Sequence, residues 1–501
     1  MAVKSFLLKP FAKRVASVIR RNAKNAVADQ DLILQKNIAK AKETQFGKDH
    51  GLGKVKTYDE YKRTVPVRDY EGLRNYFDQV KNGSPNILWP GIPKYLAKTS
   101  GTTSGAKYIP LTKDSIPNHF GTARNALFNY YAQSGQGNWV DGKMIFLSGS
   151  PSLSKTSGIL TGRLSGIVNH MVPTWLKGNQ LPSYDTNCID DWEEKLSRIV
   201  DETIDQDMRL ISGIPPWVQM YYERLLEKSG ASTVSKLFPN FNMFVYGGVN
   251  FEPYREVLER LVGKSIPSIE TYPASEGFIA FQDDVADPGL LLNTKSGIFF
   301  EFVRVDEFGK SDATRYSLGQ VSLGVNYVVV LNTNAGLWAY NIGDTVKFVS
   351  LAPYKLVVTG RLSHFISAVG EHVIGKEVEV AMVNACKLHD TKVIEFTVAP
   401  QITPSSGLPY HEWLVAFEKP PKDMELFSQT LDNEMSKQNI YYQDLIKGGI
   451  LRRLIITPLQ KNAFREYMKS KGKLGGQNKV PRLSNDRKIA KELIAYKLDA
   501  K

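Results

Sequence analysis

The segment Lys98-Thr99-Ser100-Gly101-Thr102-Thr103-Ser104-Gly105-Ala106-Lys107 is the most informative stretch of this chain. Five of its ten side chains are hydroxyls, three positions are Gly or Ala, and both ends are Lys. A segment with so little apolar surface cannot pack as a core element. Small residues let the backbone approach an anion, while amide N–H groups, hydroxyls and Lys supply hydrogen bonds and charge. We therefore expect a loop that binds the polyphosphate of ATP. It lacks the spacing of a Walker loop, and a solvated linker is the alternative.

Apolar patterns on both sides of this loop predict the fold. Strand-like residues precede it at Ile87–Trp89 and Tyr95–Leu96, and a helix is expected from about Ser115. Beyond it, short apolar runs alternate with helical patterns, which predicts an α/β architecture with helix-covered sheets. The later strands, from 297 to 358, follow one another without helices and predict an antiparallel hairpin or a small barrel-like sheet. The expected strands are Met144–Leu147, Arg209–Ser212, Met243–Tyr246, Gly297–Val303, Gln320–Leu331 and Tyr354–Val358, and expected helices are Asp191–Glu202, Pro216–Lys228 and Pro253–Val262.

The pattern changes after Gly360, where a smaller α+β domain of about 140 residues is expected. We place the boundary near Arg361–Ser363, which gives domains 1–361 and 362–501. The expected helices are Gly375–Leu388, Lys422–Lys437 and Asn462–Ser470, and the expected strands are Lys392–Ala399, Glu412–Glu418 and Arg452–Thr457.

Length and composition limit the class of protein. The 501 residues are enough for one large domain and a smaller one. Two cysteines, Cys188 and Cys386, argue against a disulfide framework or a zinc cluster and fit a reducing cytosol, so a cytoplasmic protein is expected. No run of about 18 apolar residues exists, so we expect no transmembrane segment.

The formal charge of +13 is unevenly distributed. Residues 1–25 hold seven Lys/Arg and no acid, and residues 451–501 hold fourteen Lys/Arg against four Asp/Glu. We see no RNA-binding motif, zinc finger or helix-turn-helix, so a nucleic-acid partner is not expected. A basic tail that closes over a triphosphate would explain the C-terminal charge. The N-terminal segment predicts an amphipathic helix docked on the domain, with a transit peptide or membrane-surface helix as the alternative.

The segment Glu270-Thr271-Tyr272-Pro273-Ala274-Ser275-Glu276-Gly277 reads as a strand that leads into a turn. Tyr272 could stack on a purine, and Ser275 could bond a phosphate oxygen. Glu276 could hold Mg²⁺, a hard cation that prefers oxygen ligands. A surface turn with a solvated Glu is the alternative.

Two further segments suit nucleotide binding. In Ala339–Asp344, an Asp at a strand end after Gly can accept hydrogen bonds from ribose hydroxyls. An ordinary hairpin turn is the alternative. In Val358–His364, Arg361 follows a strand at the domain junction and can contact ribose and phosphate near a hinge. The alternative there is an interdomain salt bridge.

Together these motifs resemble the adenylate-forming enzymes, such as firefly luciferase and acyl-CoA synthetases. The match is closest to bacterial members of the Gretchen Hagen auxin-responsive family of acyl acid–amido synthetases, and it covers nearly the whole chain. The order of the motifs carries the resemblance. Beyond the segments above, the motifs are Thr44-Gln45-Phe46-Gly47, Val65-Pro66-Val67-Arg68-Asp69-Tyr70, Leu88-Trp89-Pro90-Gly91, Gly370-Glu371-His372-Val373 and Gly476-Gln477-Asn478-Lys479-Val480-Pro481-Arg482.

The resemblance implies a monomeric enzyme in which residues 1–361 bind ATP and a carboxylic acid and residues 362–501 form a mobile lid. The carboxylate would attack the α-phosphate of ATP, with Mg²⁺ present, and an amine, usually an amino acid, would then displace AMP. Fixed donors and cations would stabilise the charge that develops on the phosphates. The implied phosphate ligands are Ser100, Gly101, Thr102, Thr103, Ser104 and Lys107; Gly247, Gly248 and Tyr272 would line the adenine pocket, with Ser275, Glu276, Asp344 and Arg361 as above.

Other assignments stay open at this level. Lys479 is the candidate for a mobile lysine that bridges carboxylate and phosphate, with Lys473 as the competitor. Gly247 and Gly248 could instead form a plain turn. An acyl-CoA ligase and a non-catalytic nucleotide-binding protein are the alternative functions. Aromatic residues that could line an acyl pocket, and that are as readily core, are Phe120, Phe128, Tyr130, Tyr131, Trp175 and Trp217, and His119 is read as structural.

Overall fold

The computed structural model describes residues 3–99, 107–189, 191–248, 251–362, 365–366, 373–402, 404–447, 451–474 and 480–498. The chain divides into two compact units. The larger comprises Met1–Ile342 and Lys347–Val357, and the smaller comprises Gly343–Val346 and Val358–Lys501. A boundary at residue 361 between two functional domains stays a prediction.

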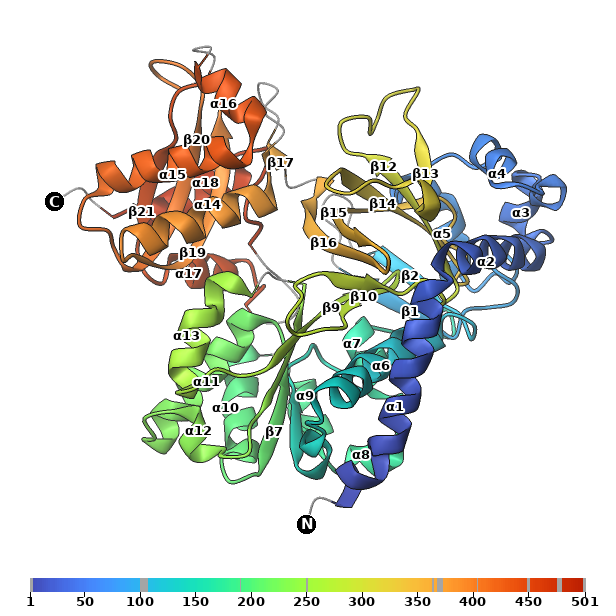
Figure 1. The fold of residues 1–501 in the computed structure, drawn as a ribbon, viewed down its shortest axis with the longest axis horizontal. Coiled ribbons are helices and arrows are strands. Elements are labelled where there is room, and N and C mark those ends of the chain that lie inside the picture. The colour runs from blue at the N-terminus through green and yellow to red at the C-terminus, as the bar shows by residue number, and fades with distance from the viewer. Residues whose placement is uncertain are drawn as a thin grey trace. The chain divides into compact units, whose positions relative to one another are not determined.

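A twelve-stranded sheet organises the larger unit (Figure 1). Its order is β13-β12-β14-β15-β16-β11-β10-β9-β8-β7-β3-β6. A four-stranded sheet of order β2-β1-β5-β4 accompanies it. The strands are β1 Tyr95–Thr99, β2 Lys107–Leu111, β3 Lys143–Phe146, β4 Ser154–Thr156, β5 Ile159–Gly162, β6 Gln180–Leu181, β7 Met208–Ser212, β8 Met243–Gly247, β9 Ser268–Ala274, β10 Gly277–Gln282, β11 Leu290–Leu292, β12 Ile298–Arg304, β13 Arg315–Ser317, β14 Asn326–Thr333, β15 Tyr340–Leu351 and β16 Tyr354–Arg361.

Helices connect the parallel strands of this sheet. Strands β6, β3, β7, β8 and β9 pair in parallel, and the chain returns between them through helices, as parallel pairing requires. Local signals set the helix ends: Asp191 accepts a hydrogen bond from the Glu194 N–H at the start of α10, and Gly230 and Gly263, with φ of 70° and 83°, end α11 and α13. The helices are α1 Val3–Lys24, α2 Ala26–Ala41, α3 Gln45–Asp49, α4 Tyr58–Thr64, α5 Arg74–Lys81, α6 Ile116–Ser134, α7 Leu164–Asn169, α8 Thr174–Lys177, α9 Tyr184–Cys188, α10 Trp192–Thr203, α11 Pro215–Ser229, α12 Val234–Leu237 and α13 Glu252–Val262.

The strands between 297 and 358 are antiparallel where β12 pairs with β14, as expected, and hydrogen bonding continues from them into the parallel strands. Two strand predictions are wrong. Gln320–Leu331 begins as a strand only at Asn326, because a turn at Gly324 (φ 75°) precedes it. The buried residues Ile87–Trp89 form bends, since Asn86 and Gly91 both have positive φ and prolines flank the segment.

The N-terminal helix α1 docks on the larger unit and packs against α6 (Figure 1). Ala12 and Val15 are buried in a cluster with Phe128, Tyr131 and Trp139. The prediction of a docked amphipathic helix is therefore confirmed. No helix among the described residues is long and apolar enough to span a membrane.

The smaller unit is an α+β domain around a three-stranded sheet of order β19-β20-β21. Side chains alternate between its two faces. Trp413 and Val415 of β20 pack in one core cluster, whereas Leu414 and Ala416 pack in another, so helices cover both faces. The elements are β17 Phe365–Ile366, β18 Val373–Ile374, α14 Gly375–Leu388, β19 Lys392–Gln401, β20 Tyr410–Lys419, α15 Met424–Gln438, α16 Ile440–Lys447, β21 Ile455–Leu459, α17 Ala463–Ser470 and α18 Lys488–Leu493.

Candidate nucleotide site at the strand ends

Two of the predicted segments meet at the carboxyl ends of β8 and β9. Gly247 is the last residue of β8 and lies opposite Thr271 of β9. A Cβ at Gly247 would lie 2.3 Å from the Thr271 carbonyl oxygen, so the close approach requires glycine. Gly248 follows with a φ of 72°, and Tyr272 beside Thr271 is buried. The backbone of Gly247–Gly248 and the ring of Tyr272 thus occupy the sheet edge where α/β proteins bind ligands.

The turn that carries Ser275 and Glu276 is fixed by hydrogen bonds from a side chain of α6. Gly277 pairs with Ala274, so Ser275 and Glu276 form the two-residue connection between β9 and β10. Asn118 of α6 makes two hydrogen bonds to the backbone of Phe278, just after this turn. The Asn118 Oδ1 accepts from the Phe278 N–H at 2.7 Å, and the Asn118 Nδ2 donates to the Phe278 carbonyl at 3.1 Å. Glu276 is half-buried. The predicted strand-to-turn geometry is confirmed, and the carboxylate stands at the strand end with a fixed backbone.

The predicted phosphate-binding segment, from Ser100 to Ala106, connects β1 and β2. Thr99 pairs with Lys107 across this antiparallel hairpin, so both ends of the loop are adjacent. The Lys107 Nζ lies 5.8 Å from the centre of the Tyr70 ring, and the Tyr70 hydroxyl accepts from the Tyr108 N–H. Ser100, Gly101, Thr102, Thr103 and Ser104 lie outside the described residues, so their role stays a prediction.

Asp344 and Arg361 are brought together by the structure. The Arg361 Nε donates to the Asp344 Oδ1 at 2.7 Å, with the Asp344 side chain 13% exposed and the Arg361 side chain 53% exposed. Asp344 lies within β15, so the expected strand end and the hairpin-turn alternative are both wrong, while its role toward the ribose stays a prediction. Gly343, with a φ of 82°, interrupts the pleat just before it.

Of the two candidate C-terminal lysines, Lys473 lies among the described residues. Lys473 follows α17, and its backbone N–H donates to the Met468 carbonyl. Lys479 lies outside the described residues, as does the segment 367–372 that includes Gly370–His372. The structure therefore leaves the choice between the two lysines as a prediction.

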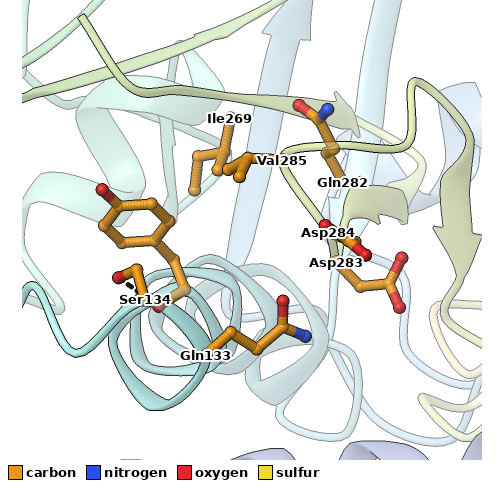
Figure 2. Close-up of a pocket in the computed structure, with 8 residues that line it drawn as sticks. Gln133, Ser134, Ile269, Gln282, Asp283, Asp284 and Val285 are labelled. Atoms are coloured by element: carbon orange, nitrogen blue, oxygen red, sulfur yellow. Dashed lines mark hydrogen bonds between the residues drawn. The ribbon is translucent and has the colours of Figure 1, made fainter.

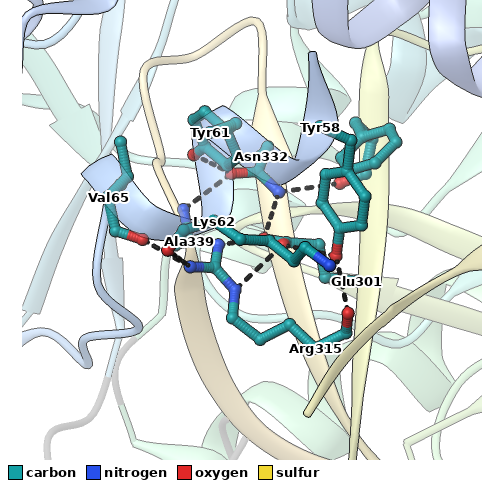
Figure 3. A network of polar contacts seen from close by, with 9 residues as sticks. Tyr58, Tyr61, Lys62, Val65, Glu301, Arg315, Asn332 and Ala339 are labelled. Carbon is teal, nitrogen blue, oxygen red and sulfur yellow. Dashed lines mark hydrogen bonds and ion pairs between the residues drawn. The ribbon is translucent and has the colours of Figure 1, made fainter. Parts of the chain in front are cut away.

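A buried polar network supports the start of β15 (Figure 3). Glu301 of β12, fully buried, accepts from Arg315 Nη2 at 2.8 Å and from Asn332 Nδ2 at 2.8 Å. The Asn332 Oδ1 accepts from the Ala339 N–H at 2.7 Å, one residue before β15. Burial and then Glu301 raise the pKa of Tyr58, which donates to that carboxylate at 2.9 Å. The sequence held one signal of this network that we missed: a lone acid in the apolar strand Ile298–Arg304.

Three of the motifs that carry the family resemblance, around Phe46, Arg68 and Leu88, contact the segment that leads into β15. Arg68 forms an isolated parallel β-bridge with Tyr340. In this bridge, the backbone N–H of Arg68 donates to the Ala339 carbonyl. The Leu88 carbonyl accepts from the Trp338 ring N–H at 3.1 Å. Phe46 stacks on Trp338 with 5.9 Å between ring centres. These motifs therefore build the scaffold that leads into β15.

His119 and the aromatic candidates are mostly core. Burial lowers the pKa of His119 to about 4, and its Nδ1 has no hydrogen-bond partner among the described residues. Phe120 is half-buried, and the Trp175 side chain lies outside the described set. The fully packed candidates are Phe128, Tyr130, Tyr131 and Trp217.

A separate pocket of about 180 Å³ lies at the opposite end of β9 (Figure 2). Ile269, the second residue of β9, lines it, whereas Glu276 follows the carboxyl end of that strand. This pocket is therefore not the predicted nucleotide site. Its lining residues are Tyr130, Gln133, Ser134, Ile269, Gln282, Asp283, Asp284 and Val285.

Comparison with known protein families identifies the chain. Residues 15–190 match the GH3 family N-terminal domain, residues 291–361 the GH3 family central domain, and residues 376–488 the GH3 family C-terminal domain. The chain belongs to the GH3 family. The family prediction is confirmed, while the bacterial origin stays a prediction.

Individual GH3 proteins align at low identity. Indole-3-acetic acid-amido synthetase GH3.4 of Arabidopsis thaliana is 24% identical, over 96% of this chain and 94% of that protein. Jasmonoyl--L-amino acid synthetase JAR4 of Nicotiana attenuata is 21% identical, over 77% and 78%. The alignment with GH3.3 of Arabidopsis thaliana, at 26% identity, spans only 46% of that relative.

Solved structures show the same fold. The acyl acid amido synthetase AtGH3.15, in complex with 2,4-DB, superimposes with a TM-score of 0.79 at 18% identity, over 97% of this chain and 96% of that one. A 2-hydroxyisobutyryl-CoA ligase in the postadenylation state gives 0.56 at 11% identity, over 96% and 91%. The predicted α/β fold class, with a large N-terminal and a smaller C-terminal part, is thereby confirmed. The predicted enzyme class is confirmed by the family match together with the curated relatives, which are named as synthetases.

The part of the chain that the structure describes contains no group of three His, Cys, Asp or Glu residues that could hold a metal ion. Mg²⁺ commonly keeps its waters and binds one or two carboxylates together with substrate phosphates. A single carboxylate at Glu276 fits that mode of binding.

Proposed function

We propose that this GH3 protein uses ATP to activate a carboxylic acid as its acyl-adenylate and then transfers the acyl group to an amine, in most cases an amino acid. One observation supports this above the rest. Gly247–Gly248, Tyr272 and Glu276 share the carboxyl edge of the parallel strands in a chain whose GH3 relatives are named as amido synthetases.

The chemistry needs few reactive side chains. A carboxylate oxygen attacks the α-phosphorus, and the bond to pyrophosphate breaks. The amine nitrogen then attacks the acyl carbon, AMP leaves with the bonding electrons, and the nitrogen loses a proton. Both steps build charge on phosphate oxygens, so positioned donors and cations supply most of the rate enhancement.

Each of the proposed site residues would have a separate role in these two steps. Lys107 and the loop from Ser100 to Ser104 would hold the phosphates. Glu276 would hold Mg²⁺ with those phosphates, and Tyr272 would face the purine. Asp344 would accept from the ribose hydroxyls, because an ionised carboxylate presents acceptor oxygens to hydroxyl donors. Lys479 would approach the reacting carboxylate.

An acid-dependent ATP–pyrophosphate exchange screen tests the proposal. The panel contains aromatic, aliphatic and indolic acids, because the relatives' names include indole-3-acetic acid and a jasmonate. Exchange that depends on one acid class supports adenylation. ATP binding by calorimetry without exchange on any acid would favour a non-catalytic protein instead.

The acceptor needs a separate measurement, because an acyl-CoA ligase shares the first step. Products formed with CoA and with an amino acid mixture are compared by mass spectrometry. An acyl-amino acid supports the amido synthetase function, and an acyl thioester alone would replace it. Light scattering and cell fractionation test the expected monomer and cytoplasmic location.

Lys479→Ala should lower exchange by about a hundredfold or more while ATP binding by calorimetry changes little, since the lysine acts on developing charge. The matched variant is Lys473→Ala. A large loss of exchange in Lys473→Ala, with no loss in Lys479→Ala, would assign the role of the reactive-site lysine to Lys473.

Glu276→Gln should weaken the Mg²⁺ dependence of exchange, with the half-saturating Mg²⁺ raised about tenfold, because one charged oxygen ligand becomes neutral. The control is Glu307→Gln, at a turn of the same unit where the carboxylate pairs with Arg304. A Mg²⁺ titration that matches the parent would remove the metal assignment.

A further inference from the structure

The helix α1 is firmly attached by one of its faces. Ala12, Val15 and Ala16 are buried against the larger unit. The Asp141 Oδ1 accepts from the backbone N–H groups of Lys4 and Ser5, at 3.0 and 3.1 Å, which caps the first turn. The helix is thus part of the folded unit, and its other face is a fixed surface of the protein.

That outer face carries apolar side chains in a row. Leu7, Phe11 and Val18 follow one another at spacings of four and seven residues, which places them along one line of a helix. Leu7 is 68% exposed and its neighbour Phe6 is 75% exposed. A single exposed apolar residue is ordinary, but a row of them on one helix marks an interaction surface.

Cations of the same helix flank this row. The helix holds seven Lys/Arg and no Asp or Glu. Six of the seven are exposed on the outer face, and none of the six pairs with an acid among the residues that the structure describes. They are Lys9, Lys13, Arg14, Arg20, Arg21 and Lys24.

We propose that the outer face of α1 binds the surface of an anionic lipid bilayer. Phe6 and Leu7 would enter the boundary between headgroups and acyl chains, while Phe11 also packs edge-on against Phe128 of α6. The flanking Lys and Arg would contact anionic headgroups. Charge alone would suit a nucleic acid equally well. The exposed apolar row favours a lipid bilayer over a nucleic acid as the partner, because a phosphate backbone offers no apolar surface to these side chains. The attachment is peripheral and reversible.

The test uses the full-length protein and sedimentation with large vesicles. We compare pure phosphatidylcholine with phosphatidylcholine that contains about a third phosphatidylglycerol. The expected result is at least about fivefold more bound protein on the anionic vesicles, with most of that gain lost at 1 M salt, where screening is strong. Absence of binding to the anionic vesicles, or equal binding to both, would overturn the proposal.

Surface variants separate the two components of the face. Phe6→Ser/Leu7→Ser removes apolar groups, and Arg14→Glu/Arg21→Glu reverses charge; each should lower vesicle binding about fivefold or more. All replaced side chains are exposed, and unchanged melting temperatures verify folding.

The matched control is Lys264→Glu/Lys310→Glu, which changes the net charge equally on exposed positions of the same unit. This control should keep vesicle binding within about twofold. A loss equal to that of Arg14→Glu/Arg21→Glu would reduce the effect to overall charge and overturn the proposal. Binding of duplex DNA without binding of vesicles would assign the face to nucleic acid instead.

Discussion

Two arginine–carboxylate pairs in this protein have nearly the same length and opposite surroundings. Glu301–Arg315 joins its atoms at 2.8 Å with side chains 0% and 9% exposed. Asp344–Arg361 joins its atoms at 2.7 Å, but Arg361 is about half exposed. The first pair is enclosed by Asn332 and Tyr58, whereas the second has one partner in water. The two pairs therefore differ in their environment rather than in their length.

The physical reason is desolvation. Removing two charges from water costs several kcal/mol for each ion, so a buried pair persists only with close geometry and further hydrogen bonds. Burial opposes the charge on Arg315, yet Glu301 outweighs it and the pKa of Arg315 is raised. An exposed pair contributes about 0–1 kcal/mol and can exchange its partner without large cost.

The largest effect should follow from breaking the buried pair. Arg315→Met leaves the Glu301 carboxylate uncompensated and should lower stability by about 3–5 kcal/mol, seen as a fall of the thermal midpoint. Arg304→Met, at the exposed end of the neighbouring strand, is the control and should cost less than about 1 kcal/mol. Equal shifts in the two variants would abolish the distinction between the pairs.

His119 sharpens the comparison, because it is buried without a countercharge. Burial holds the pKa of His119 at about 4 against an ordinary 6.5. The unfolded chain therefore binds the extra proton between pH 6.5 and 4, and stability should fall by up to about 3 kcal/mol as the pH drops through that window.

Thermal midpoints of the parent and of His119→Asn, measured from pH 7 to pH 4, check this. The parent should lose stability more steeply, since the variant has no imidazole to protonate. Parallel curves would mean that the folded protein accommodates the charged ring.

The smallest structural effect should come from the exposed pair. Asp344→Asn should change stability by less than about 1 kcal/mol while raising the KM for ATP about tenfold, because the charged acceptor for the ribose is lost. Asp306→Asn, which also removes the carboxylate that pairs with an exposed arginine, should alter neither quantity. A loss of stability without a change in KM would make Asp344 part of the scaffold.

Local elements were predictable from the chain. The helix Gly375–Leu388 has the predicted bounds, and Thr57 caps α4 through a capping box with Glu60. The turn at Ser275–Glu276 also lies where expected. Each depends on a periodicity or on contacts within a few residues, which a sequence displays directly.

The partners of the charges were not predictable in the same way. Arg361 was assigned to ribose and phosphate, with an interdomain salt bridge as the alternative, and the structure adds its contact with Asp344 from the neighbouring strand. The sequence analysis assigns no role to Glu301, although it is the one acid in the apolar strand Ile298–Arg304. Both pairings depend on which strands become neighbours and on how deeply they are buried.

The chain alone indicates most of the helices and strands, the order of the motifs and the family, because helical periods, caps and turn residues act over short distances. The folded structure is needed to show that Glu301 is enclosed and that Asp344 pairs with a half-exposed arginine. The free energy of a charge depends on the water and partners around it, and these are set by segments far apart in the chain.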